Sequence, residues 1–395
     1  MTEHPTGGGR NAEGGSEGGF SLVELLISMT VMLLVVGSVF TLVDPSQSTS
    51  RTQPEAADVL QRLRISADLM EKDLLMAGAG TYSGAIAGSL ANYFPPVMPY
   101  RTGMKYPSEN LTYSFDRISI AYVPSTASQT NVRDSMPMTS SEVKVYSQPG
   151  CPDVIPPDNL CGFKEGMRVL IFDDTGAYDF FTITQVQSTG TEGHLQHNPT
   201  MNPGADLSKK YSEADNARIA QVETHVYWLR PTQDQDGHPV NELVHYDGAL
   251  EEIAFVDNVA GLRIRYYGDP NPPTAPRPAA GQSNCIMDAS GTLLLPTLPS
   301  NGSSLVELTP SMFTDGPICG SGMTAFDADL FRIRKVSVQI RTQAAARELR
   351  GVNPSNLPPD RWIFRNPGTS NNSYRRVPDY LVEFDVTPRN MNLVR

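Results

Sequence analysis

Residues 20–43 read FSLVELLISMTVMLLVVGSVFTLV, an apolar run in which Glu24 is the single charged side chain. About 20 consecutive apolar residues in an α-helix cross the hydrocarbon core of a bilayer. The run therefore predicts one membrane-spanning helix, to which we assign residues 20–44.

Residues 1–19, MTEHPTGGGRNAEGGSEGG, are polar and rich in glycine. A secretory signal has a basic start and a small-residue cleavage site after its apolar stretch, whereas here the small residues precede the apolar stretch. We interpret residues 1–19 as a leader and expect the helix to stay with the mature chain. The leader has three glutamates and one arginine, so the charge signal for membrane orientation is weak.

Glu24 lies near the start of the predicted membrane helix, where a carboxylate is costly and usually functional. A glutamate that snorkels to the interface, or that is protonated, would be the simpler interpretation. Glu24 is however preceded by Gly19 and Phe20 and followed by an unbroken apolar run, and the four features together form a specific pattern.

The segment GFSLVELL, residues 19–26, resembles the type IV prepilin motif. The resemblance implies that a prepilin peptidase cuts after Gly19 and methylates the new N-terminus, so that Phe20 becomes an N-methylphenylalanine. It also implies that Glu24 pairs with the N-terminal amine of an adjacent subunit and sets its register during pilus assembly.

A second helix is predicted after the membrane segment. Asp44-Pro45 should end or kink the first helix, because proline lacks the backbone N–H that a helix interior needs. Residues 45–80 are then expected to form a polar linker followed by an amphipathic helix at about 54–78, with Gly78 and Gly80 as stop signals. Its apolar face, expected to pack on a β-sheet, comprises Val59, Leu63, Ala67, Met70, Leu74 and Ala77. Mixed charges populate the rest of this helix, namely Arg62, Arg64, Asp68, Glu71, Lys72 and Asp73.

Residues 81–395 are expected to form a β-rich body. The candidate strands are 117–123, 142–147, 167–172, 178–186, 222–229, 243–246, 262–267, 332–341 and 380–386. Turn residues predict one hairpin at 173–176 and another at 233–237. Stretches rich in Pro, Gly, Ser and Asn at about 269–325 and 349–377 are interpreted as large surface insertions. The predicted fold class is therefore α+β, with a long N-terminal helix packed on an antiparallel sheet.

The order of these features resembles the PilW-like minor pilins and the related J-type pseudopilins of type II secretion. The resemblance lies in RLRISADLMEKDLLMAGAG at residues 62–80, in the strand-turn-strand at 167–187, and in Arg389-Asn390. It implies a pilin-like fold and a minor pilin without catalytic activity, near the tip or priming complex of a type IV pilus. The alternatives are a type II secretion pseudopilin and a membrane-anchored surface adhesin or enzyme.

The implied partners are other pilins, prepilin peptidase and the inner membrane. The implied location is a single-pass inner-membrane protein with an extracytoplasmic body, which is later built into a pilus at the cell surface. The net charge of −12 and the pI of about 5.0 provide no basic stripe for nucleic acid or for acidic lipid, so neither is expected as a partner.

Four cysteines occur, and none forms a CxxC pair. In an extracytoplasmic body an even number indicates two disulfides, with three possible connectivities. Neighbour pairing, Cys151–Cys161 and Cys285–Cys319, is the hypothesis adopted here. Four reduced, buried thiols are the alternative for a cytosolic body.

The sequence patterns that resemble catalytic or metal-binding motifs are each better explained as turns or surface residues. Asp174-Thr175-Gly176 has no second Asp-Thr-Gly with which to share a proton, so a hairpin turn is predicted instead. His194 and His197 lie three apart in a predicted loop without a third ligand, and are interpreted as surface histidines. Residues 234–237 resemble a turn more than a calcium loop. We therefore expect no catalytic residue, no metal site and no cofactor.

Overall fold

The computed structural model describes residues 19, 21–80, 89–100, 113–124, 128–147, 160, 162–188, 192–198, 206–233, 237, 239–248, 252–346, 349–350 and 377–392, with the backbone alone for 42–49 and 323. The chain divides into two compact units, Met1–Pro54 and Glu55–Arg395. The second unit is called the body below.

A single helix, α1, extends over Leu22–Met76 and has 55 residues. Of the two outcomes predicted at Asp44-Pro45, an end or a kink, the helix end at residue 44 and the linker before a second helix are therefore wrong. An internal proline costs a helix about 3 kcal/mol relative to alanine. Long helical segments on both sides of Pro45 propagate cooperatively and can absorb that cost, so the backbone stays helical.

Helix α1 ends just before Gly78 and Gly80, the residues that predicted its end. Gly78 has φ +71°, a left-handed conformation that glycine adopts without penalty, and its N–H donates to the carbonyl of Ala121. A Cβ at this position would lie 3.1 Å from Pro96 Cγ and 3.2 Å from Met391 Cγ. Gly78 thus stops the helix and lets the chain pass close to the body.

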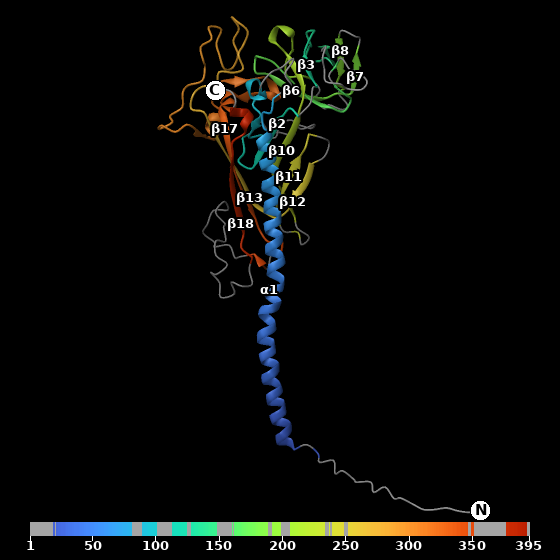
Figure 1. Cartoon of the computed structure of the whole chain (residues 1–395), viewed down its shortest axis with the longest axis vertical. Helices are drawn as coiled ribbons and strands as arrows, with labels where there is room; N and C mark the ends of the chain where they lie inside the picture. The colour runs from blue at the N-terminus through green and yellow to red at the C-terminus, as the bar shows by residue number, and fades with distance from the viewer. Residues whose placement is uncertain are drawn as a thin grey trace, which may run out of the picture. The chain divides into compact units, whose positions relative to one another are not determined.

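The described strands of the body form antiparallel sheets (Figure 1). The first sheet has the order β1 (Val97–Met98), β2 (Arg117–Tyr122), β10 (Glu223–Gln233), β11 (Pro239–Tyr246) and β12 (Glu252–Val256). The second has the order β14 (Val306–Leu308), β13 (Val259–Gly268), β17 (Ile333–Thr342) and β18 (Tyr380–Val386).

Two smaller sheets and a two-stranded pair complete this set. The third sheet has the order β3 (Gln129–Asn131), β9 (Arg218–Gln221), β5 (Arg168–Phe172) and β6 (Tyr178–Thr182). The fourth has the order β4 (Glu142–Tyr146), β8 (Glu192–Gln196) and β7 (Gln185–Ser188), and β15 (Ile318–Cys319) pairs with β16 (Phe326–Asp327). The 3-10 helices are η1 (Leu90–Asn92), η2 (Glu213–Asp215), η3 (Pro310–Phe313), η4 (Gly322–Thr324), η5 (Ala328–Arg332) and η9 (Arg389–Asn392).

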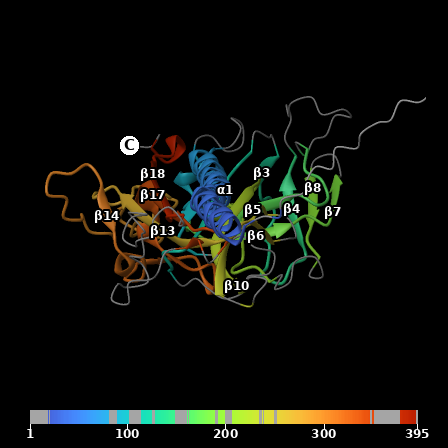
Figure 2. The ribbon, with the colours of Figure 1, turned by 90° about the horizontal axis from the view of Figure 1, so that it is seen from below.

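The C-terminal part of α1 supplies one side of the main hydrophobic core. Its residues Leu63, Met70, Leu74 and Ala77 pack with apolar side chains of the first two sheets. Figure 2 shows β13, β17 and β18 on one side of the body and β3 to β8 on the other, with β10 between them. A second core lies between the third and fourth sheets. The α+β prediction, with a helix packed on antiparallel sheet, is confirmed at this level.

Each predicted strand overlaps a strand of the structure, with one division. Both predicted hairpins are formed, with Phe172 opposite Tyr178 and Gln233 opposite Pro239. The segment 178–186 divides into β6, which pairs with β5, and β7, which pairs with β8 in another sheet.

The segment 269–325 is exposed or half-buried over much of its length, but it is more than the predicted surface insertion, because some of its residues enter the core. Its residues Ile286, Leu295 and Phe313 are buried in the main core. The predicted disulfide Cys285–Cys319 is formed within it, with an S–S distance of 1.97 Å. These buried apolar residues are too widely spaced along the chain to form a periodic pattern. Cys151 and Cys161, and the second predicted insertion between residues 351 and 376, lie outside the described residues.

The prediction of two surface histidines in a loop is also wrong. His194 belongs to β8, and its Nδ1 lies 2.6 Å from Glu142 Oε1. His197 is 1% exposed and packs against Phe181, with 4.6 Å between the ring centroids. Neither ring nitrogen of His197 has a hydrogen-bond partner among the described residues. Burial lowers the pKa of His197 to about 4.

Replacement of His197 by leucine should make the body less sensitive to acid. The unfolded histidine has a pKa near 6.5, so the unfolded chain binds more protons than the native chain between about pH 6.5 and 4. The native state is therefore fully stable with respect to this group above that window and loses up to about 3 kcal/mol as the pH falls through it. Urea unfolding of the full chain in detergent at pH 7 and pH 4.5 should show a smaller acid loss for His197→Leu than for the wild type.

His194→Leu is the matched control and should retain the part of the acid loss that His197 causes. An acid loss in His197→Leu equal to that of the wild type would contradict this account.

Candidate functional site

The first part of α1 is an uncovered apolar helix. Residues Leu22–Thr41 are long and apolar enough to cross a membrane, by length and composition, and none of this segment is buried within the chain. Large side chains such as Leu33 and Phe40 are 72% and 66% exposed. An apolar surface of this extent normally contacts lipid or other protein, which agrees with a single-pass membrane anchor.

The start of α1 is locally well defined. Ser21 precedes the first helical residue, and its Oγ accepts a hydrogen bond of 3.3 Å from the N–H of Val23. Glu24 lies three residues after Ser21 in the first turn, where a capping box places a glutamate and where the helix dipole favours negative charge. Glu24 therefore has a local structural role open to it besides the assembly role that its motif implies. Gly19 is exposed, and Phe20 lies outside the described residues.

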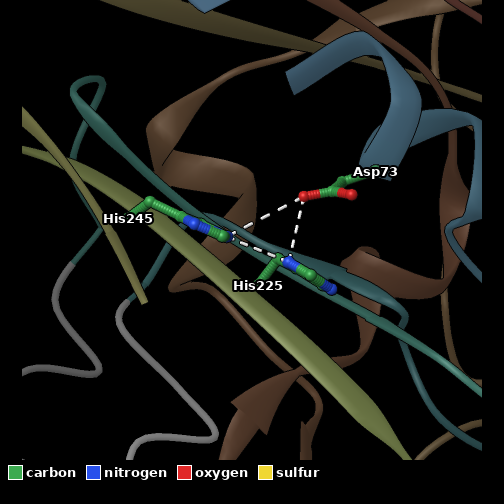
Figure 3. A group of neighbouring side chains, drawn as sticks. All are labelled: Asp73, His225 and His245. Carbon is green, nitrogen blue, oxygen red and sulfur yellow. Dashed lines mark hydrogen bonds and ion pairs between the residues drawn. The ribbon is translucent and has the colours of Figure 1, made fainter. Parts of the chain in front are cut away.

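A second site lies within the body, at the C-terminal part of α1 (Figure 3). Asp73 points from α1 toward His225 on β10 and His245 on β11. Asp73 Oδ2 is 3.0 Å from His225 Nδ1 and 3.9 Å from His245 Nε2. His225 Nδ1 is 2.9 Å from His245 Nε2. These three residues are called the Asp-His-His cluster.

Two tyrosines contact the Asp-His-His cluster through hydrogen bonds and ring stacking. The hydroxyl of Tyr227 donates to Asp73 Oδ2, and its ring stacks on His245 with 4.6 Å between centroids. Tyr122 Oη lies 3.0 Å from His225 Nε2, with the two rings nearly parallel. The side chains therefore have few orientations available.

The cluster is largely shielded from water. The side chain of Asp73 is 4% exposed, and those of His225 and His245 are 13% and 15% exposed. Burial raises the pKa of Asp73, but hydrogen bonds from His225 and Tyr227 outweigh it and leave that pKa below its usual value. Burial and the neighbouring His225 lower the pKa of His245. Burial and the Asp73 carboxylate raise the pKa of Tyr227 well above its ordinary value.

This cluster was not predicted from the sequence. Asp73 was assigned to the polar side of the helix, although it lies three residues after Met70 and four before Ala77. Those spacings place it on the apolar face, so periodicity could have identified a buried carboxylate. The two histidines belong to strands far along the chain from Asp73, and only the sheet brings them to it.

Three other aspartates are held by hydrogen bonds or an ion pair within the body. Asp174 of the predicted hairpin turn accepts from Arg218 Nη1 at 2.8 Å and from Asn216 Nδ2 at 2.7 Å. Asp327 accepts from the N–H groups of Asp329 and Gly316, and Asp329 forms an ion pair with the buried Arg332. Asp174, Asp327 and Asp329 thus all have hydrogen-bond or ion-pair partners within the body.

Comparisons of the chain with protein-family models, with curated proteins and with solved structures find no match.

Tyr227→Phe should destabilise the body, because it leaves a buried carboxylate with one hydrogen bond fewer. Hydrogen bonds to charged groups contribute about 1.5–3 kcal/mol to stability, and a loss of that size is expected in urea unfolding of the full chain.

Tyr267→Phe is the matched control. Tyr267 lies on β13, and its ring faces the Lys335 ammonium at 4.2 Å, an interaction that phenylalanine retains. Equal stability of Tyr227→Phe and Tyr267→Phe would show that the hydroxyl contributes nothing at Asp73.

Proposed function

We propose that this protein is a structural subunit of a type IV pilus-like filament, a minor pilin that assembles through the first part of α1. The observation that carries the proposal is the exposed apolar segment Leu22–Thr41, with Glu24 in its first turn and Gly19-Phe20 immediately before it. A membrane anchor alone requires the apolar segment but not a carboxylate in it.

The chemistry of assembly follows from a cut after Gly19. The cut creates a cationic amine at Phe20, at the end of a helix that enters a low-dielectric environment. Attraction between this amine and the Glu24 carboxylate of a neighbouring subunit strengthens as the dielectric constant falls. Desolvation opposes the pairing, so the pair stabilises the assembly only when both groups meet in the correct register.

The body supports the same proposal. Its α1 segment packs an apolar face on antiparallel sheets, an arrangement compatible with a pilin-like subunit. The body extends over Glu55–Arg395, most of the chain, and a unit of that size would crowd a regularly packed filament. We therefore place the subunit near the tip or in the priming complex, with its body outside the cytoplasmic membrane.

Mass spectrometry of the mature protein from its native host tests the processing step. The expected N-terminal peptide begins at Phe20 and carries one methyl group on its amine. A mature chain that retains residues 1–19 would refute processing and would favour a membrane-anchored surface protein outside the filament class.

Glu24→Gln tests the assembly step separately from the helix cap. Glutamine also fits the capping position, so the helix should start normally, but the negative charge that attracts the amine is lost. The expected result is normal insertion into the membrane, with incorporation into sheared filaments reduced at least tenfold in immunoblots.

Glu71→Gln is the control, since Glu71 is an exposed glutamate on the same helix within the body. If Glu24→Gln is incorporated into filaments as well as the wild type, the proposed pairing of Glu24 with the N-terminal amine is wrong.

A further inference from the structure

We propose that Asp73, His225 and His245 bind a divalent transition-metal ion of the zinc type, which clamps α1 to strands β10 and β11. The site is separate from the assembly segment and does not depend on the filament role. It would take two imidazole nitrogens and one carboxylate oxygen from the protein.

The distances between the donor atoms suit such an ion. Zinc binds imidazole nitrogen and carboxylate oxygen at about 2.0–2.2 Å in tetrahedral geometry, which places neighbouring ligand atoms about 3.3–3.6 Å apart. The donor atoms of the cluster are 2.9, 3.0 and 3.9 Å apart. These values lie on both sides of the ideal, so small side-chain rotations would form the site.

The hydrogen-bond partners of His225 suit a metal ligand. Without a metal ion, Nδ1–H donates to Asp73 Oδ2, 3.0 Å away. Tyr122 Oη lies 3.0 Å from Nε2 on the outer side of the ring and can accept a hydrogen bond there. When the neutral ring carries its proton on Nε2, that proton is donated to Tyr122, and the Nδ1 lone pair faces Asp73 and His245, where a metal ion would take the place of the Nδ1 proton.

Such an outer partner is typical of metal-binding histidines, because it orients the ring and selects the nitrogen that binds the metal. Three electron-rich atoms thus converge on one point in a largely buried place. Something positive must lie between them, either protons or a cation. The donor set of two histidines and one carboxylate is one that zinc and other first-row divalent ions take.

The surroundings favour a structural site. The His245 ring is held between Tyr227, stacked at 4.6 Å, and the edge of Phe255 at 6.1 Å between centroids. The fourth position is left to water, which can reach the partly exposed histidines. The ion would join a helix residue to two strands that follow much later in the chain, and it would stabilise the native state because the unfolded chain has no such site.

The test uses the purified full-length chain in detergent, carrying no polyhistidine tag and stripped with EDTA. Zinc chloride is titrated against a chromogenic zinc chelator, and bound metal is counted by plasma mass spectrometry after gel filtration. The expected result is one zinc ion per chain and a melting temperature that rises on zinc addition. His225→Gln and His245→Gln should each weaken zinc binding at least tenfold and abolish the thermal shift.

His194→Gln is the matched control. His194 also lies beside two carboxylates, with Glu142 at 2.6 Å and Glu192 at 3.4 Å, but on β8 in another sheet. It should bind zinc as the wild type does. Substoichiometric binding by the wild type, or undiminished binding by both cluster variants, overturns the proposal and leaves the cluster as a protonated hydrogen-bond network.

Cobalt substitution gives a readout that does not require a stable variant. Cobalt(II) in a four-coordinate nitrogen and oxygen site absorbs visible light far more strongly than the hydrated ion. Stoichiometric cobalt addition to the wild type should produce this band, and zinc should displace it. A spectrum identical to that of hydrated cobalt would refute the site even if every cluster variant failed to fold.

Discussion

The burial of Asp73, which α1 carries against the first sheet, is the constraint on which the packing of the body depends. A carboxylate removed from water costs several kcal/mol unless other groups replace its hydration. Tyr227 and His225 replace it here, and both come from β10. The apolar residues of α1 could pack on a sheet in several registers shifted by one helical turn, since hydrophobic contact has no direction. The carboxylate meets its donors in one register alone and so specifies how the helix lies on the sheet.

The two parts of α1 differ in how their apolar side chains are arranged around the helix. Residues Leu22–Thr41 present apolar side chains on all sides and bury none of them within the chain. Between Val59 and Ala77 one stripe of apolar residues is buried, whereas other apolar residues of this part, such as Ile65 and Leu75, are exposed. The difference follows from composition, because a helix that is apolar all round needs an apolar environment all round, whereas a one-sided helix needs one partner surface. The proposed filament role and the packed body thus use one continuous element in two ways.

Prediction from sequence succeeded where periodicity is strong and failed where contacts are distant. Alternating and continuous apolar runs located both hairpins and the edge strand β18. The proline rule failed at Pro45, because a local penalty of a few kcal/mol does not outweigh helix on both sides. The segment 269–325 has no periodic pattern, so the burial of some of its residues could not be seen, although the pairing of Cys285 with Cys319 was anticipated. His197 was taken for a surface residue because nothing in its local sequence reveals that it packs against Phe181.

By itself, the sequence determined the apolar segment, the position of Glu24 within it, the helical stripe from residue 59 to 77 and most of the strands. These features depend on residue types at short, regular spacings, which sterics and the hydrophobic effect translate directly into helices and strands. The tertiary structure alone decided which strands share a sheet, that α1 is continuous, and that Asp73 meets two histidines. Those outcomes depend on residues that are far apart in the chain, and no local rule acts over such a separation.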